Sequence, residues 1–280
     1  MLAINTNLIS INAQRNLYAS RDSMAQAIQR LSTGLRVNSA KDDAAGLAIA
    51  NRMDAQARGM TVASRNANDG ISLAQTAEGA LGKVTDMLQR MRELAVQAAN
   101  ASNTSADRSS LNNEFQQMAQ EVDRTLQSTR FNGQAILASA AGALQFQIGA
   151  NNSASDQLTV TTTNMVTNSS ISAVTVSTAT ISGTTGSNAS SMLTALDTAI
   201  DQVNTERSVY GAMQNRFEAV IANLAIASEN QMAARSRIMD ADFARETAAL
   251  TRAQILQQAG TAMLTQANSV PQGVLALLRG

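Results

Sequence analysis

The chain has 280 residues, of which 21 are basic and 21 acidic, and its formal net charge is zero. A chain without excess positive charge lacks the electrostatic footprint of a nucleic-acid-binding protein. Cysteine and histidine are both absent, which excludes disulfides, a thiol nucleophile, a histidine-based triad and the usual zinc sites. We therefore expect no enzyme, and no catalytic, cofactor or metal site.

The first residues do not form a secretory signal peptide, because they lack a basic start, an apolar core and a small-residue cleavage site. No apolar run reaches the length of about 18 residues that a membrane span needs, so we expect no membrane partner. These observations predict a chain that is cytoplasmic, or exported by a route that leaves its N-terminus intact.

The first expected helix covers residues 5–35. Apolar residues recur along it in steps of seven, which predicts a seam on one side that another helix must bury. The seam and its flanks consist of Leu17, Met24, Ile28, Leu31 and Leu35. The polar residues 38–43 end this helix. Asp42 and Asp43 are expected to stabilise the start of the next helix, and as neighbours that point in different directions they do not make a catalytic acid pair.

An alternating three- and four-residue spacing of Ala, Leu, Val and Met predicts a second helix over residues 44–100. At 1.5 Å per residue it would be about 85 Å long, which predicts a rod rather than a compact domain. A polar connection follows at residues 100–105. A third helix is then expected to end near Thr129 and to run antiparallel to the second.

The middle of the chain changes to a period of two. Asn132 and Gly133 predict a tight turn. Leu144, Phe146 and Ile148 alternate with polar residues, and Leu158 and Val160 follow a loop, which predicts a small β-hairpin region.

The uncharged, Ser- and Thr-rich segment that follows this region is expected to be an exposed, variable loop, in which Val174 and Val176 allow one or two short strands. Most of residues 163–187 should then be dispensable for assembly. A second interpretation is a site for O-linked glycans.

Helical spacing returns near residue 190 and continues to about Arg237. Residues 239–242 form a second joint, and the last helix begins near Phe243. Its apolar seam is again spaced in steps of three and four and requires a partner helix. The seam consists of Leu256, Gly260, Met263, Ala267, Val270, Val274 and Leu277.

The expected fold is mainly α. It is a long antiparallel helical rod, resembling a coiled coil, with a small β-hairpin region at one end and the N- and C-terminal helices paired at the other. We expect a terminal helical domain of residues 1–43 and 238–280, a rod domain of residues 44–130 and 190–237, and a β-hairpin and Ser/Thr-rich region of residues 131–189. The seams at both ends favour a subunit that completes its core by assembling with other copies.

Several ordered motifs give the chain a family resemblance. They are Ala3–Asn7, Arg30–Gly46, Arg92–Ala98, Phe131–Gly133 and Ala267–Leu278. With these motifs the chain resembles bacterial flagellin along nearly its whole length, except between about residues 138 and 190, where flagellins diverge. It lacks the extra outer domains of large flagellins.

The resemblance implies a structural subunit of the bacterial flagellar filament, used for swimming. The terminal helices would form the inner tube and the rod helices the surrounding layer, with export by the flagellar type III route to the outside of the cell. The implied partners are other copies of the chain, an export chaperone at the C-terminal helix, and filament cap and hook-associated proteins. The implied polymerisation residues are Leu17, Met24, Ile28, Leu31, Leu35, Leu256, Met263, Val270, Val274 and Leu277.

The resemblance also implies recognition by the Toll-like flagellin receptor of animals. The matching positions are Gln89, Arg90, Leu94, Gln97 and Glu114. In the alternative interpretation these are ordinary rod residues, with Arg90 and Glu93 solvated and Leu94 in contact with another subunit.

Two other functions remain as alternatives. A hook–filament junction protein shares the terminal heptads but usually lacks the motifs at Arg92–Ala98 and Val270–Gln272. A secreted helical module that binds a host receptor or a membrane as a monomer would fold its termini without polymerising.

Overall fold

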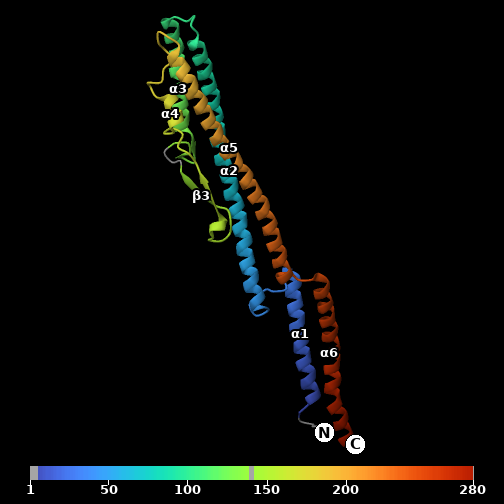
Figure 1. Cartoon of the computed structure of the whole chain (residues 1–280). Helices are drawn as coiled ribbons and strands as arrows, with labels where there is room; N and C mark the ends of the chain where they lie inside the picture. Colours follow the sequence, from blue (N-terminus) through green and yellow to red (C-terminus); the bar gives the residue numbers. More distant parts are fainter. Residues whose placement is uncertain (1–5, 139–141, 280) are drawn as a thin grey trace. The chain divides into compact units, whose positions relative to one another are not determined.

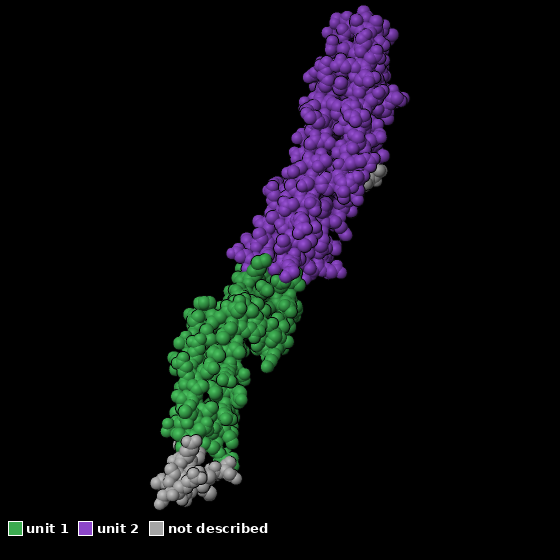
Figure 2. All heavy atoms as spheres, turned by 180° about the vertical axis from the view of Figure 1, so that it is seen from behind, with its two compact units in different colours: residues 1–55, 230–280 green, residues 56–229 purple. Residues whose placement is uncertain are grey.

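The computed structural model describes residues 6–138 and 142–279, and for residues 270–279 it describes the backbone alone. The chain is mainly helical, with two small antiparallel sheets, so the fold class expected from the sequence is confirmed (Figure 1). It divides into two compact units, residues 1–55 with 230–280 and residues 56–229 (Figure 2), which we describe separately.

The first unit contains the two terminal helices, α1 (Leu8–Thr33) and α6 (Phe243–Arg279), which run side by side (Figure 1). The side chain of Asn7 caps α1 by accepting a hydrogen bond from the Ser10 N–H, and Gly34 ends it with φ at 71°. That left-handed conformation favours glycine, because other residues incur a Cβ clash there.

The two joints of the chain meet in the first unit. Leu35 pairs with Asp240 in an antiparallel β-bridge, and the Ala241 N–H donates to the Gly34 carbonyl at 2.9 Å. A small apolar cluster lies beside this bridge. It consists of Val37, Ala50 and Met239, with Leu35, Leu47 and Ile238 packed against them.

The two aspartates before α2 (Ala44–Ala99) have different tasks. Asp43 accepts a hydrogen bond from the Gly46 N–H at 2.8 Å, as expected of a residue at a helix start. Asp42 instead accepts from the backbone and hydroxyl of Ser39 and so orders the preceding turn. These hydrogen bonds hold the pKa of the Asp42 carboxyl below its usual range.

The second unit is built on long stretches of α2 and α5 (Ser187–Met239) together with α3 (Ser105–Ser128). The alternating seam predicted for α2 is buried from Ala63 to Ala98, which confirms that part of the sequence interpretation. Helix α3 contributes Phe115, Val122 and Leu126 to the same core. It begins at a capping box, in which Thr104 and Asp107 satisfy each other's backbone N–H groups.

The predicted hairpin chemistry is also confirmed. β1 (Arg130–Phe131) and β2 (Gln134–Ala135) are joined by Asn132 and Gly133, both at positive φ. β3 (Ala143–Gln147) pairs antiparallel with β4 (Gln157–Thr161), and Phe146 lies opposite Leu158. Phe146 also meets Phe217 of α5 edge to face, with ring centroids 5.3 Å apart.

The interpretation of residues 163–187 as an exposed loop with short strands is wrong. Val174 lies in a helix, α4 (Ser169–Thr175), which Asn168 caps, and Val176 ends it. The segment has few large apolar side chains, but those it has point inward. Met165, Ile171, Val174, Ala179 and Ile181 are all buried in the core of the second unit.

Polar contacts fix the same segment to α3. The Asn112 side chain accepts a hydrogen bond from the Ile181 N–H at 2.9 Å, and the buried Arg108 donates to the Thr184 carbonyl at 3.1 Å. The low charge and high Ser/Thr content that predicted a loop do not prevent this segment from packing, because its few apolar side chains are the buried ones.

Candidate functional site

Helices α1 and α6 meet through small side chains. Ser10, Ser20 and Ala27 of α1 are buried, as are Ala253 and Ala267 of α6. Such residues let two backbones approach closely, but they bury little apolar area. Leu17 is the exception: its side chain packs over Gly260, where an added Cβ would lie 3.3 Å from a Leu17 methyl carbon.

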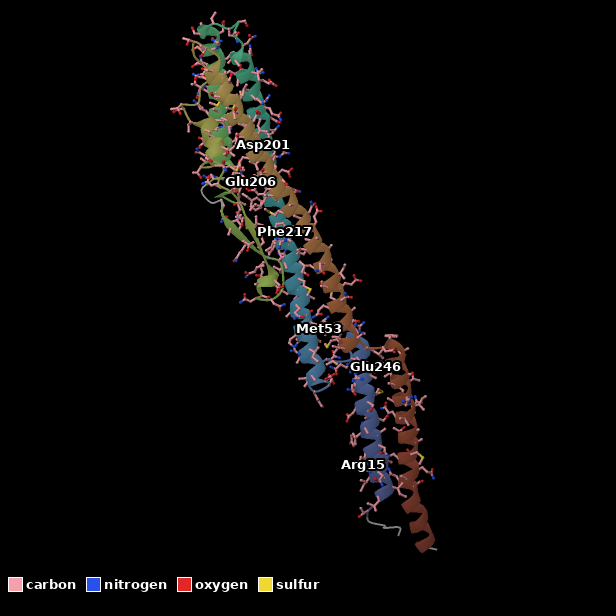
Figure 3. The ribbon with its side chains drawn as sticks, viewed as in Figure 1. Arg15, Met53, Asp201, Glu206, Phe217 and Glu246 are labelled. Atoms are coloured by element: carbon pink, nitrogen blue, oxygen red, sulfur yellow. The ribbon has the colours of Figure 1, made fainter. Side chains whose placement is uncertain are left out.

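Three polar contacts fix the register of this antiparallel pair. The Asn7 side chain donates to the Ala267 carbonyl at 2.8 Å, and the Ser20 hydroxyl donates to the Ala253 carbonyl at 3.1 Å. The third is an ion pair of Arg30 with Glu246, 3.0 Å apart and largely shielded from solvent. Glu246 is labelled in Figure 3.

Large apolar side chains stay exposed on the outside of this pair. Leu256 is 54% exposed and Met263 61% exposed, although a helix partner lies beside them. We call the whole set the terminal apolar surface. It consists of Leu8, Ile9, Ile11, Tyr18 and Ile28 on α1, and Phe243, Ile255, Leu256 and Met263 on α6. Large apolar side chains left exposed in this number indicate an interaction site.

A groove of about 840 Å³ runs along the seam between α1 and α6. Small residues line part of it, among them Ala13, Ser20 and Gly260. Larger apolar residues and one cation line the rest. These are Ile9, Leu17, Arg252, Leu256 and Met263. We call it the terminal groove.

The residues proposed for polymerisation lie in different environments. Ile28, Leu256 and Met263 are exposed and belong to the terminal apolar surface. Leu17, Met24 and Leu31 are half-buried in the chain itself, and Leu35 packs in the joint cluster. The side chains of Val270, Val274 and Leu277 lie outside the described part of the structure.

Sequence reasoning missed part of the terminal apolar surface. Ile11 and Tyr18 are seven residues apart and share a face of α1 that the predicted seam did not include. The sequence signal for these two residues is that same seven-residue spacing, on a second stripe of α1. Ile255 and Phe243 have no comparable spacing, and their exposure is visible only in the structure.

The residues considered for receptor recognition lie in the second unit. Gln89 and Gln97 are exposed. Arg90 forms ion pairs with Glu93 at 2.8 Å and Glu114 at 2.9 Å, and these raise the pKa of its guanidinium. Leu94 differs from them, because it is 1% exposed and belongs to the core. The expectation that the Leu94 side chain contacts another subunit is therefore wrong for the chain in this form.

Within residues 6–138 and 142–279, we find no group of three or more acidic residues placed to hold a metal ion. No helix in the described ranges is long and apolar enough to cross a membrane.

Two sequence-family models match the chain. The bacterial flagellin N-terminal helical region matches residues 4–142, and the bacterial flagellin C-terminal helical region matches residues 193–278. The chain belongs to the flagellin family. Flagellins are structural proteins, so this chain is a structural component of the flagellar filament and not an enzyme.

Flagellins of other bacteria match this chain over nearly its whole length. A flagellin of Halalkalibacterium halodurans is 48% identical over 99% of this chain and 100% of its own length. A flagellin of Xenorhabdus nematophila is 43% identical over 99% of each chain. A solved flagellar hook-associated protein from Vibrio parahaemolyticus is 12% identical, with a TM-score of 0.58 over 71% of this chain and 100% of its own. That likeness shows a shared fold.

Proposed function

We propose that this flagellin polymerises through its terminal helices, and through the helical layer around them, into the filament that drives swimming. The terminal apolar surface is the observation that carries this proposal. Fully burying one Leu, Ile or Met side chain contributes about 1.5–3 kcal/mol. Several such side chains are exposed on α1 and α6, so contact between copies is the direct way to remove them from water.

The proposal assigns a role to each part of the chain. Residues 1–43 and 238–280 would form the inner tube, residues 44–130 and 190–237 the surrounding layer, and residues 131–189 the outermost region. The small residues along the α1–α6 contact support the assignment of residues 1–43 and 238–280 to the inner tube. They let the two helices lie close together, and a narrow helix pair allows many copies to pack around one axis.

Assembly of purified chains tests the proposal. Replacing both Leu256 and Met263 with Asp would place two carboxylates in the proposed contact, where an unpaired charge is costly to bury. Gln254→Asp with Thr261→Asp is the matched control, because these exposed residues have the same seven-residue spacing on a different face of α6. Sedimentation and electron microscopy should show filaments for the wild type and the control, and none for the Leu256/Met263 variant.

Two outcomes would contradict the proposal. Filaments from the Leu256/Met263 variant at the wild-type protein concentration would show that this surface is not a contact. A wild-type chain that stays monomeric under all assembly conditions, including seeding with filament fragments, would favour the monomeric receptor-binding alternative. The hook–filament junction alternative is disfavoured by the flagellin matches at both ends of the chain.

We also propose that the chain is exported to the cell exterior by the flagellar type III route without cleavage. An export chaperone would bind α6, which exposes Phe243, Ile255 and Leu256 before assembly. Cap and hook-associated proteins would contact the growing and basal ends. Mass spectrometry of secreted protein should find the N-terminus uncleaved, and deleting residues 243–279 should abolish co-purification with the chaperone.

Recognition by the Toll-like flagellin receptor is a further proposal. The exposed side chains of Gln89, Arg90, Gln97 and Glu114 support it, while Leu94 would support it only by holding α2 in place. Arg90→Ala should reduce signalling by the monomer in receptor-reporter cells. Arg124→Ala, which also removes an exposed arginine from an i,i+3 ion pair, should not.

A further inference from the structure

The turn between β1 and β2 contains the only Asn-Gly pair in the chain. Asn132 and Gly133 both have positive φ, at 47° and 81°, and both are exposed to solvent. When glycine follows asparagine, the glycine nitrogen can approach the asparagine side chain without hindrance, because glycine has no Cβ. A Cβ added at Gly133 would meet no atom within 4 Å, so the turn itself is also uncrowded at this residue.

The polar groups of this turn have no hydrogen-bond partners among the described residues. This holds for the Asn132 side-chain amide and for the Gly133 N–H. In the turn before α2 the equivalent groups are occupied. There the Asn38 amide donates to a backbone carbonyl at 3.0 Å, and the Ser39 N–H donates to Asp42 at 2.9 Å. The Asn132 amide is therefore free to turn toward the Gly133 nitrogen.

A positive charge is held beside the same turn. The Arg130 guanidinium donates a hydrogen bond to the Gly133 carbonyl at 3.1 Å. For the Gly133 nitrogen to attack a carbonyl carbon it must give up its proton, which leaves a negative charge on the peptide group. A nearby cation stabilises such an anion. The turn thus combines an accessible side-chain amide, an unhindered nitrogen and a favourable charge.

We propose that Asn132 is a site of spontaneous deamidation. The Gly133 nitrogen forms a bond to the Asn132 Cγ atom, the bond from Cγ to the side-chain nitrogen breaks, and ammonia leaves with the proton that the Gly133 N–H gives up. The product is a five-membered succinimide ring. The proposal goes beyond filament assembly and does not depend on it, because it concerns one turn of the second unit.

Water then opens the ring at one of its two carbonyl carbons. Cleavage at the side-chain carbonyl leaves an aspartate with an ordinary backbone. Cleavage at the main-chain carbonyl leaves an isoaspartate, in which the backbone runs through the former side chain. Both products carry one more negative charge than asparagine, and the only other reactant is water.

The two products should affect the hairpin differently. Aspartate tolerates the left-handed conformation of this position, so the turn should keep its form. Isoaspartate lengthens the backbone by one methylene group, whereas the pairing of Phe131 with Gln134 fits a turn of two residues. The residues that follow, Ala135, Ile136 and Leu137, are buried in the second unit. Isoaspartate should therefore loosen the attachment of this segment to the core.

Peptide mass spectrometry of the aged protein tests the proposal. The folded chain is kept in mildly alkaline buffer, and each deamidation adds about 1 Da to the peptide that contains it. Asn152 is the matched control within the same chain, because it is also exposed but is followed by Ser153, whose Cβ hinders the approach. Asn132 should convert at least about tenfold faster than Asn152.

Two results would overturn the proposal. The first is equal conversion of Asn132 and Asn152 in the folded chain. The second is an Asn132 that stays intact in the folded chain but converts in a chain unfolded by urea, because the turn would then protect the amide. Neither result depends on whether the chain forms filaments, so both are distinct from a failure of the proposed function.

Urea unfolding tests the expected consequence. An Asn132→Asp chain is the matched control, because it has the charge of the products without the longer backbone, and it should unfold at the wild-type urea concentration. The isoaspartate form, identified by an isoaspartyl methyltransferase and separated by chromatography, should unfold at a lower concentration. Identical unfolding of the isoaspartate form and the Asn132→Asp chain would contradict the loosening of the hairpin.

Discussion

Gly70 of α2 lies directly against the ring of Phe217 of α5, so that a Cβ added at Gly70 would be 2.5 Å from the Cζ atom of Phe217. Phe217 is fully buried and also contacts Phe146 of the hairpin, so its ring has little room to move. The contact joins two helices and the β3–β4 sheet at one point of the second unit.

Gly70→Ala should therefore destabilise the second unit by about 1–3 kcal/mol, the usual cost of overpacking. Gly79 is the control, because no atom lies within 4 Å of a Cβ added there. Gly79→Ala should instead stabilise the helix by about 0.5–1 kcal/mol, since alanine has less conformational entropy to lose. Urea unfolding of both variants measures the difference, and a neutral Gly70→Ala would show that the ring adapts.

Arg108 should be a major determinant of the second unit's stability. Its buried guanidinium donates to the carbonyls of Ala98, Asn100 and Thr184, at 2.8, 3.0 and 3.1 Å. Arg108→Ala would remove all three hydrogen bonds, of which the one to the Ala98 carbonyl is buried, and should cost about 2–4 kcal/mol. Arg124→Ala is the control, because it removes an exposed arginine from the same helix. The Arg124→Ala chain should unfold at the same urea concentration as the wild type. Equal midpoints for the two variants would contradict this account.

The Ser/Thr-rich segment should behave as part of the core. Ile171→Ala and Ile181→Ala should each destabilise the second unit by about 2–4 kcal/mol, because both side chains are fully buried. Val176→Ala is the control, since Val176 is 44% exposed. Deleting residues 163–187 should lower the unfolding temperature. Wild-type stability in the deletion variant would restore the interpretation of this segment as a loop.

Tyr210 should stay protonated until the second unit unfolds. Its hydroxyl is buried and has no hydrogen-bond partner among the described residues, and burial, with the nearby Glu206 carboxylate, raises the pKa of the phenol well above its usual value. A raised native pKa contributes stability that is fully present below the unfolded pKa of about 10 and is lost as the pH rises above it.

In a Tyr18→Phe chain, which has Tyr210 alone, the absorbance change of phenol ionisation should coincide with the loss of helical circular dichroism. Ionisation at a pH where the helices remain intact would contradict the burial of this hydroxyl.

The sequence predicted those parts of the fold that repeat along the chain. Leu81 and Leu88 of α2 are seven residues apart and buried, and the alternation around Phe146 identified the hairpin. Ile171 and Ile181 could not be placed in this way, because isolated apolar residues in a polar segment have no period. Their burial depends on packing against α3 and on the rest of the core of the second unit, which form only in three dimensions. Leu94 shows the same limit, since a motif match does not say which side of a helix faces the core.

The bridge between Leu35 and Asp240 joins residues that are far apart in the sequence, and this has a consequence for both terminal helices. α1 ends two residues before Leu35, and α6 begins three residues after Asp240. A change of backbone conformation at this one point therefore acts on the two helices together and not on either of them alone.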